Sequence, residues 1–123
     1  MTIVYADDDP EDRELFSDAL KEVAPHTMLI LASHGKEVIT FLQDAVDRPD
    51  FIFLDINMPI MGGKDCLLKL KTLDAVKDIP VIMYTTTSNK RELQKYIEMG
   101  AQDYIVKEPS FKGIKDSLRK VFK

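Results

Sequence analysis

The sequence of 123 residues has one cysteine, no tryptophan and no long apolar run. With Cys66 alone, neither an internal disulfide framework nor a cysteine-rich zinc site can form. Positive charge is also scarce, because 17 Lys and Arg face 21 Asp and Glu, and a net charge of -4 argues against nucleic-acid binding. The start, MTIVYADDDP, lacks a basic signal-peptide region, and no stretch is apolar enough to span a membrane. We therefore expect a cytoplasmic protein without a membrane partner.

Short apolar runs alternate with amphipathic stretches along the chain. The composition, 45% hydrophobic and 31% charged, is that of a single globular domain. The apolar runs predict five strands, at residues 3–6, 27–32, 51–54, 80–84 and 104–106. The spacing of apolar residues predicts one helix after each strand. In chain order, the apolar positions of the five helices are Leu15, Phe16, Ala19, Leu20 and Val23; Val38, Ile39, Leu42 and Val46; Leu67, Leu68 and Leu70; Leu93, Tyr96 and Ile97; and Ile114, Leu118, Val121 and Phe122.

The helix ends carry their own signals. Asp9, Ser88 and Ser110 are predicted N-caps of the first, fourth and fifth helices, and Gly100 is the predicted end of the fourth. Five strand–helix units predict an α/β fold, a doubly wound parallel sheet of five strands with five helices on its two faces. In such sheets the working site lies beyond the carboxyl ends of the strands.

Acidic, hydroxyl and basic residues stand at those strand ends. The first strand is followed by Asp7, Asp8 and Asp9, the third by Asp55, the fourth by Thr85 and the fifth by Lys107. Two carboxylates 4 Å apart repel by ~4 kcal/mol at an effective dielectric constant near 20, and a raised pKa or a bound cation relieves this. Oxygen ligands without His or Cys favour Mg²⁺.

A carboxylate beside Mg²⁺ and a lysine can act as a nucleophile toward phosphorus and form an aspartyl phosphate. Taken singly, each residue has a plainer explanation: Asp9 is a helix cap, Asp55 a turn former, Thr85 a loop residue and Lys107 a solvated lysine. Together, at the strand ends of one fold, they predict an Mg²⁺ and phosphoryl site. His26 and His34 flank the second strand, away from this crevice, and are not expected to bind a ligand.

Four segments carry a resemblance to a known family: VYADDDPEDR (4–13), FLDINMP (53–59), PVIMYTTTS (80–88) and GAQDYIVK (100–107). In this order and at these spacings the sequence resembles the receiver domain of two-component response regulators, most of all the single-domain chemotaxis type. The resemblance covers residues 2–123. It implies a flavodoxin-like strand order of 2-1-3-4-5, and a single receiver domain over 1–123 without an output domain.

The resemblance also implies roles for the acidic residues. Asp55 matches the phosphoacceptor, which takes a phosphoryl group from a phosphohistidine of a sensor histidine kinase or phosphotransfer protein. Asp7 and Asp8 match the acidic pair that holds Mg²⁺. Asn57 matches the residue whose backbone carbonyl completes the metal site and whose side chain influences self-dephosphorylation.

Three further residues match the parts of the family that respond to phosphorylation. Thr85 matches the switch hydroxyl, Lys107 the lysine that pairs with the phosphoryl group, and Tyr104 the aromatic residue that turns inward. The expected output is a changed surface formed by the fourth helix, fifth strand and fifth helix, which a target protein or a second copy recognises. A monomer or a weak phosphorylation-dependent dimer is expected, and the only catalysis is self-phosphorylation and self-dephosphorylation.

The sequence departs from the family pattern in three places. Glu108 separates Lys107 from Pro109, so either a residue is inserted or the family's usual cis bond lies elsewhere. Gly113 falls in the first turn of the last helix, where it costs ~1 kcal/mol relative to Ala. The pair Gly62-Gly63 replaces the usual Asp-Gly and is expected to affect a loop but not the chemistry.

Two other functions stay open at this point. The first is a degenerate receiver that binds a partner constitutively, without phosphorylation. The second is an enzyme on the same sheet, a flavin mononucleotide binder or an aspartate-nucleophile phosphatase. The acidic loop DDDPED disfavours the flavin phosphate, and Asn57 stands where such a phosphatase has a second acid.

Overall fold

The computed structural model describes residues 1–44 and 48–123. Over these residues the chain alternates strands and helices: β1 (Thr2–Ala6), α1 (Pro10–Val23), β2 (Met28–Ala32), α2 (Gly35–Asp44), β3 (Phe51–Leu54), α3 (Gly63–Thr72), β4 (Val81–Thr85), α4 (Lys90–Glu98), β5 (Asp103–Val106) and α5 (Phe111–Val121). The five expected strand–helix units are confirmed. The position Val46, expected on the second helix, lies outside the described residues.

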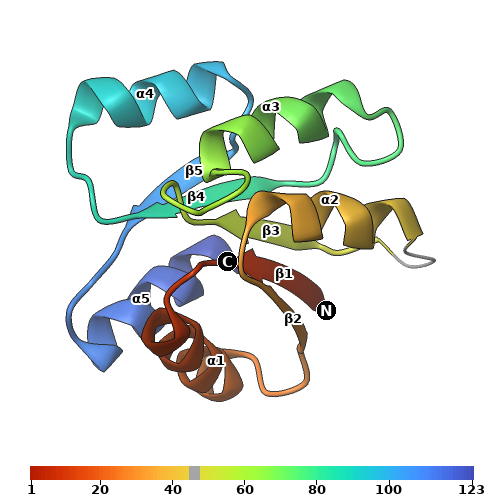
Figure 1. Cartoon of the computed structure of the whole chain (residues 1–123). Coiled ribbons are helices and arrows are strands. Elements are labelled where there is room, and N and C mark those ends of the chain that lie inside the picture. The colour runs from red at the N-terminus through yellow and green to blue at the C-terminus, as the bar shows by residue number, and fades with distance from the viewer. Residues whose placement is uncertain (45–47) are drawn as a thin grey trace.

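The strands form one parallel sheet in the order β2-β1-β3-β4-β5. This confirms the predicted α/β class and strand order. Figure 1 shows α2, α3 and α4 over one face of the sheet and α1 and α5 over the other. Among the described residues, every helix is too short or too polar to span a lipid bilayer.

Each face of the sheet has its own hydrophobic core, because successive side chains of a strand point to opposite faces. In β1, Ile3 and Tyr5 belong to the core under α1 and α5, whereas Val4 and Ala6 belong to the core under α2, α3 and α4. The central strands β1, β3 and β4 are therefore apolar at almost every position. Polar side chains begin only where these strands end.

Most of the helix ends follow the sequence signals. Asp9 and Ser110 cap α1 and α5 by accepting a backbone N–H of the first turn, and Gly100, with a φ of 112°, follows the end of α4. The prediction for α4 is wrong by one residue, since Asn89 and not Ser88 is the N-cap. An asparagine amide oxygen serves this position as well as a hydroxyl does.

Two of the apolar positions that predicted the helices lie away from the core. Leu15 is 42% exposed and Leu68 is 45% exposed. Each lies next to a fully buried residue, Phe16 and Leu67, and one residue turns a helix by about 100°. The neighbour therefore points to the core and the leucine points away from it.

Candidate functional site

The strand register brings the predicted site residues to one edge of the sheet. Ala6 pairs with Leu54, so Asp7 and Asp55 both follow paired residues, and the Asp55 N–H donates to the Ala6 carbonyl at 2.9 Å. On the next strands Thr85 pairs with Val106, which places Thr85 and Lys107 at the same edge. Residues separated by a hundred positions in the sequence therefore share one crevice.

Three carboxylates face one another in this crevice. Asp7 is fully buried, Asp55 is 9% exposed and Asp8 is exposed, and one oxygen from each lies within 4.8 Å of the others. Such an all-oxygen donor set fits Mg²⁺, which keeps some of its water ligands and binds through a few carboxylates. Asn57 is exposed in the loop between β3 and α3, two residues after Asp55.

The position of the Asp7 carboxylate is set by three donors. The Tyr5 hydroxyl donates to Oδ2 at 2.5 Å, Lys107 Nζ donates to the same oxygen at 2.8 Å, and the Asp9 N–H donates to Oδ1 at 3.0 Å. These bonds compensate for the burial of a charged group. Tyr5 is itself fully buried, and burial and its bond to Asp7 raise the pKa of the phenol, so the hydroxyl keeps its proton.

Lys107 lies among three carboxylates. Its Nζ is 2.8 Å from Asp7 Oδ2, 2.8 Å from Asp12 Oδ2 and 3.3 Å from Asp55 Oδ1. It also lies over the Tyr84 ring, 5.4 Å from the centroid. Burial lowers the pKa of Lys107, but the hydrogen bonds to Asp12 and Asp7 and the negative charges of Asp55 and Asp7 together hold the pKa above its ordinary value. The side chain is therefore an ammonium ion at neutral pH.

The Asp55 carboxylate is more basic than that of an ordinary aspartate. Burial and the negative charge of Asp7 raise the pKa of Asp55 to about 6, against the opposing effect of Lys107. A raised pKa means that the ionised form is poorly compensated in the metal-free protein. A cation beside Asp55 would supply the missing compensation.

The two predicted switch residues lie on neighbouring strands. Thr85 is 3% exposed, and its Oγ1 accepts the Thr87 N–H at 3.1 Å. Tyr104 is half-buried and packs against the core under α2, α3 and α4. The Thr85 hydroxyl is thus near the crevice but bonded to its own loop.

The loop between β3 and α3 touches the backbone of Asp55. The Gly63 N–H donates to the Ile56 carbonyl at 2.9 Å, and a Cβ at Gly63 would lie 2.1 Å from the Asp55 carbonyl oxygen. Gly63, the first residue of α3, therefore packs against the backbone of Asp55, whereas the expectation that Gly62 in place of the usual Asp affects a loop but not the chemistry stays a prediction. In the same loop Ile60 has a φ of 66° and is 75% exposed.

The two unusual features near α5 are connected. No peptide bond is cis within 1–44 and 48–123, so the segment Lys107-Glu108-Pro109 is accommodated with trans bonds. The Glu108 side chain packs over Gly113, where an added Cβ would lie 2.8 Å from the Glu108 Cβ. Gly113 weakens the helix but makes room for the residue that follows Lys107.

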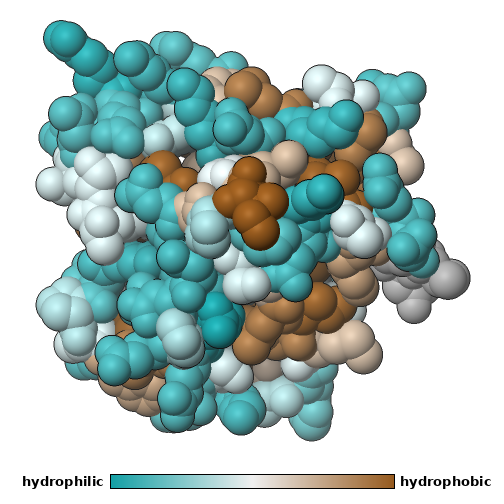
Figure 2. Space-filling model, in the orientation of Figure 1, coloured by the Kyte–Doolittle hydropathy of each residue, from teal (hydrophilic) through white to brown (hydrophobic). Residues whose placement is uncertain are grey.

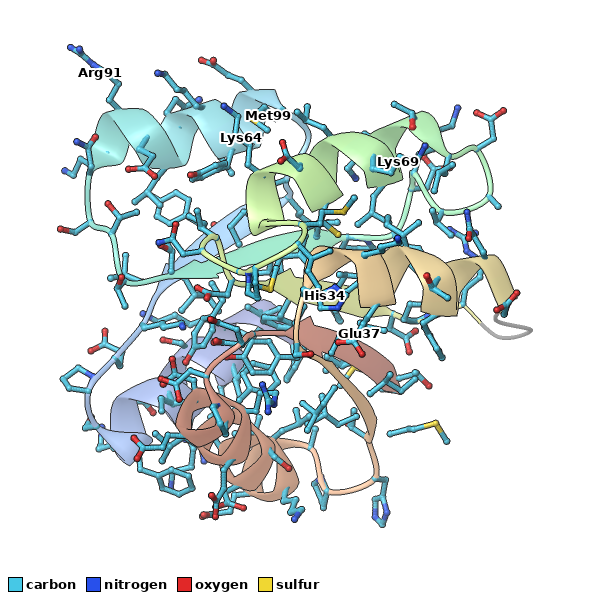
Figure 3. All side chains as sticks on the ribbon, viewed as in Figure 1. His34, Glu37, Lys64, Lys69, Arg91 and Met99 are labelled. Atoms are coloured by element: carbon cyan, nitrogen blue, oxygen red, sulfur yellow. The ribbon has the colours of Figure 1, made fainter. Side chains whose placement is uncertain are left out.

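Sequence reasoning missed Asp12, Tyr5 and Tyr84. Asp12 stands in the first turn of α1, where an acidic residue is usually explained by the helix dipole. Tyr5 and Tyr84 stand within apolar strands, where a tyrosine is usually explained by packing. The signal that could have found them is their distance from the strand ends, since each lies within five residues of Asp7 or Thr85. His34, by contrast, contacts Glu37 at the start of α2, as Figure 3 shows, and is not in the crevice.

The chain is similar to known proteins of one family over most of its length. A family model described as the response regulator receiver domain matches residues 3–119. The chain is 31% identical over 121 residues to chemotaxis protein CheY1 of Helicobacter pylori, covering 98% of the chain and 96% of that protein. It is 28% identical over 117 residues to response regulator Rcp1 of Synechocystis, covering 91% of the chain and 80% of Rcp1.

Two further matches are a solved structure and a longer protein that resembles this chain over only part of its length. The crystal structure of the Mn²⁺-bound form of Rcp1 superimposes with a TM-score of 0.84 at 26% identity, covering 98% of this chain and 90% of that one. A protein-glutamate methylesterase of Desulfotalea psychrophila is 30% identical over 107 residues, which are 87% of this chain but 29% of that protein. The likeness to the methylesterase is confined to that share of its length.

Proposed function

Because the chain belongs to the family of response regulator receiver domains in two-component signalling, we propose that it is switched by phosphorylation of Asp55. The phosphoryl donor is a phosphohistidine of a sensor histidine kinase or a phosphotransfer protein. The observation that carries this proposal is the buried Asp55 carboxylate, which shares one crevice with Asp7, Asp8 and Lys107.

The chain's own residues account for most of the transfer. An Asp55 carboxylate oxygen attacks phosphorus, the bond between phosphorus and the histidine nitrogen breaks, and the imidazole leaves with the bonding electron pair. Lys107 lies 3.3 Å from Asp55 and offsets negative charge that the phosphoryl oxygens bring. Mg²⁺, held by Asp7, Asp8, Asp55 and the Asn57 carbonyl, would neutralise the remaining charge. A related protein has been crystallised with Mn²⁺, which supports a divalent cation here.

The output step uses Thr85 and Tyr104. Thr85 exchanges its bond with the Thr87 N–H for one with a phosphoryl oxygen, and Tyr104 turns into the space that this movement opens. The surface of α4, β5 and α5 changes and is recognised by a target protein, or by a second copy in a weak dimer. Residues 1–123 act as one receiver domain, in the cytoplasm, with protein binding or phosphoryl relay as the output.

The alternatives account for fewer of the features. A constitutive binding module has no need of a lysine among three carboxylates at the buried end of a sheet. A flavin phosphate would meet Asp7 and Asp8, and a phosphatase would lack its second acid at Asn57. Self-phosphorylation and self-dephosphorylation are the only reactions that we assign.

Intact mass after incubation with a small-molecule phosphodonor tests the proposal. We expect a single phosphoryl mass gain that requires Mg²⁺ and is absent in Asp55→Asn. A gain that persists in Asp55→Asn would place the acceptor elsewhere. No gain in the wild type, even with an excess of donor and Mg²⁺, would favour the constitutive binding module.

A further inference from the structure

The contacts of Lys107 are unevenly distributed. An ammonium group has three N–H donors, and in this structure three carboxylates surround it. The two short contacts, at 2.8 Å, go to Asp7 and Asp12, whereas the proposed phosphoacceptor Asp55 is the most distant at 3.3 Å. The lysine is thus held mainly by residues other than the one whose phosphoryl group it is to pair with.

We propose that Asp12 is a positioning residue that holds the Lys107 ammonium in the unphosphorylated protein and competes with the phosphoryl group for it. This inference rests on the proposed function. Asp12 thereby lowers the affinity of the site for a phosphoryl group and limits how far the switch is populated. The negative charge of Asp12 also lowers this affinity, because it repels the incoming phosphoryl anion.

Asp12 is the carboxylate that can release the lysine at least cost. The Asp7 side chain is 1% exposed and also binds Tyr5 and Asp9, so losing Lys107 would leave a buried charge less compensated. The Asp12 side chain is 32% exposed, so water can replace the lysine. Asp12 also lies in the first turn of α1, where the helix dipole stabilises its charge whether or not Lys107 is bound.

The arrangement differs from an ordinary surface ion pair. The pairs Lys112–Asp116 and Lys77–Asp74 lie within one helix or turn and have an exposed lysine, 85% and 48% respectively. Lys107 is 12% exposed, and its bond to Asp12 joins the start of α1 to the loop after β5. A bond that has to be exchanged when the site is filled changes the binding constant, whereas a bond that merely adds stability does not.

Binding of beryllofluoride, a phosphoryl mimic, at saturating Mg²⁺ tests the inference. We expect Asp12→Asn to bind the mimic about fivefold more tightly than the wild type, the size of effect that one partly screened charge-assisted bond produces. Asp12→Glu keeps the negative charge, and its longer side chain still reaches Lys107. This variant should therefore bind the mimic as the wild type does. The ¹⁵N resonance of Lys107 Nζ should change in the mimic-free protein for Asp12→Asn only.

Glu11→Gln is the matched control. Glu11 lies in the same turn, is exposed, and makes no side-chain hydrogen bond or ion pair within the described part of the chain. If Glu11→Gln tightens binding as much as Asp12→Asn does, the effect is general electrostatics and the inference fails. Unchanged or weaker binding in Asp12→Asn would also overturn it. Failure of the wild type to bind the mimic would instead overturn the proposed function, and this inference with it.

Discussion

At the scale of single residues, burial gives the stability contribution of Asp55 a pH dependence opposite to that of an ion-paired aspartate with a lowered pKa. Its pKa is raised to about 6 from an ordinary value of 3.8. For an acid with a raised pKa in the folded state, stability is fully present below pH 4 and is lost as the pH rises through about 6. Ionisation of Asp55 therefore destabilises the folded protein in the absence of metal.

We expect Asp55→Asn to be more stable than the wild type at pH 8 in a chelator, by ~1–2 kcal/mol after allowance for solvent screening. The difference should vanish near pH 4, where the wild-type carboxyl is protonated. Urea unfolding across this pH range measures it. A difference that is the same at pH 4 and pH 8 would contradict the explanation, and Mg²⁺ should stabilise the wild type more than Asp55→Asn.

The residues that sequence reasoning found and those that it missed differ in one physical respect. Asp7, Asp55 and Lys107 are polar residues at the ends of apolar runs, so a one-dimensional pattern reveals them. Asp12 and Tyr5 have ordinary local explanations, helix dipole and packing, and their contacts with Lys107 and Asp7 exist only after folding. A pattern along the chain contains no information on such contacts.

At the scale of elements, two helices begin around a glycine that has little room for a side chain. A Cβ at Gly63 would lie 2.1 Å from the Asp55 carbonyl oxygen, and one at Gly113 would lie 2.8 Å from the Glu108 Cβ. Both substitutions to alanine force a shift, but only the first displaces the backbone of the proposed phosphoacceptor. The two sites form a natural pair for comparison.

We expect Gly63→Ala and Gly113→Ala each to destabilise the protein by ~1–3 kcal/mol, since overpacking outweighs the better helix propensity of alanine. Only Gly63→Ala should also slow phosphorylation by a small-molecule donor at a temperature where both variants are folded. Thermal unfolding and intact-mass kinetics measure the two effects. Equal phosphorylation rates in the two variants would show that the loop does not position Asp55.

The helix boundaries show what local patterns can determine. Asp9 and Ser110 are caps as predicted, because the cap bond is made within three residues and is encoded locally. Ser88 and Asn89 are adjacent and equally suitable, so the choice depends on the loop that enters α4. The place of Leu15 on the outer side of α1 depends in the same way on where the core lies.

At the scale of the whole molecule, the sheet has an apolar outer strand. In β2, Met28 is 63% exposed and Leu31 is 46% exposed. Figure 2 shows apolar surface gathered over this strand, between α1 and α2. An exposed edge with unpaired backbone groups and apolar side chains is a site for association between partly unfolded chains.

We expect Met28→Lys to reduce aggregation during heating while changing the free energy of unfolding by less than ~0.5 kcal/mol. Light scattering and reversible urea unfolding measure the two quantities. Gln43→Lys, at an exposed position on α2, adds the same charge away from the edge and should not change aggregation. Equal protection by both variants would assign the effect to net charge.

The alternation of strands with helices is enough to predict the fold class, whereas the strand order is implied only by the resemblance to a family. The five apolar runs alone do not indicate that β1 lies between β2 and β3. The order depends on how the helices divide between the two faces, and here α1 and α5 share one face with many contacts between them. That division is a property of the assembled molecule.

The absence of tryptophan has an optical consequence. The near-ultraviolet absorption of the protein comes mainly from four tyrosines. Tyr5 and Tyr84 stand edge to face with ring centroids 5.7 Å apart, one bonded to Asp7 and the other beneath Lys107. A change in the charge of the crevice alters the surroundings of both chromophores. The site therefore contains its own spectroscopic label, and its occupancy can be followed by ultraviolet difference spectra without a dye or an introduced tryptophan.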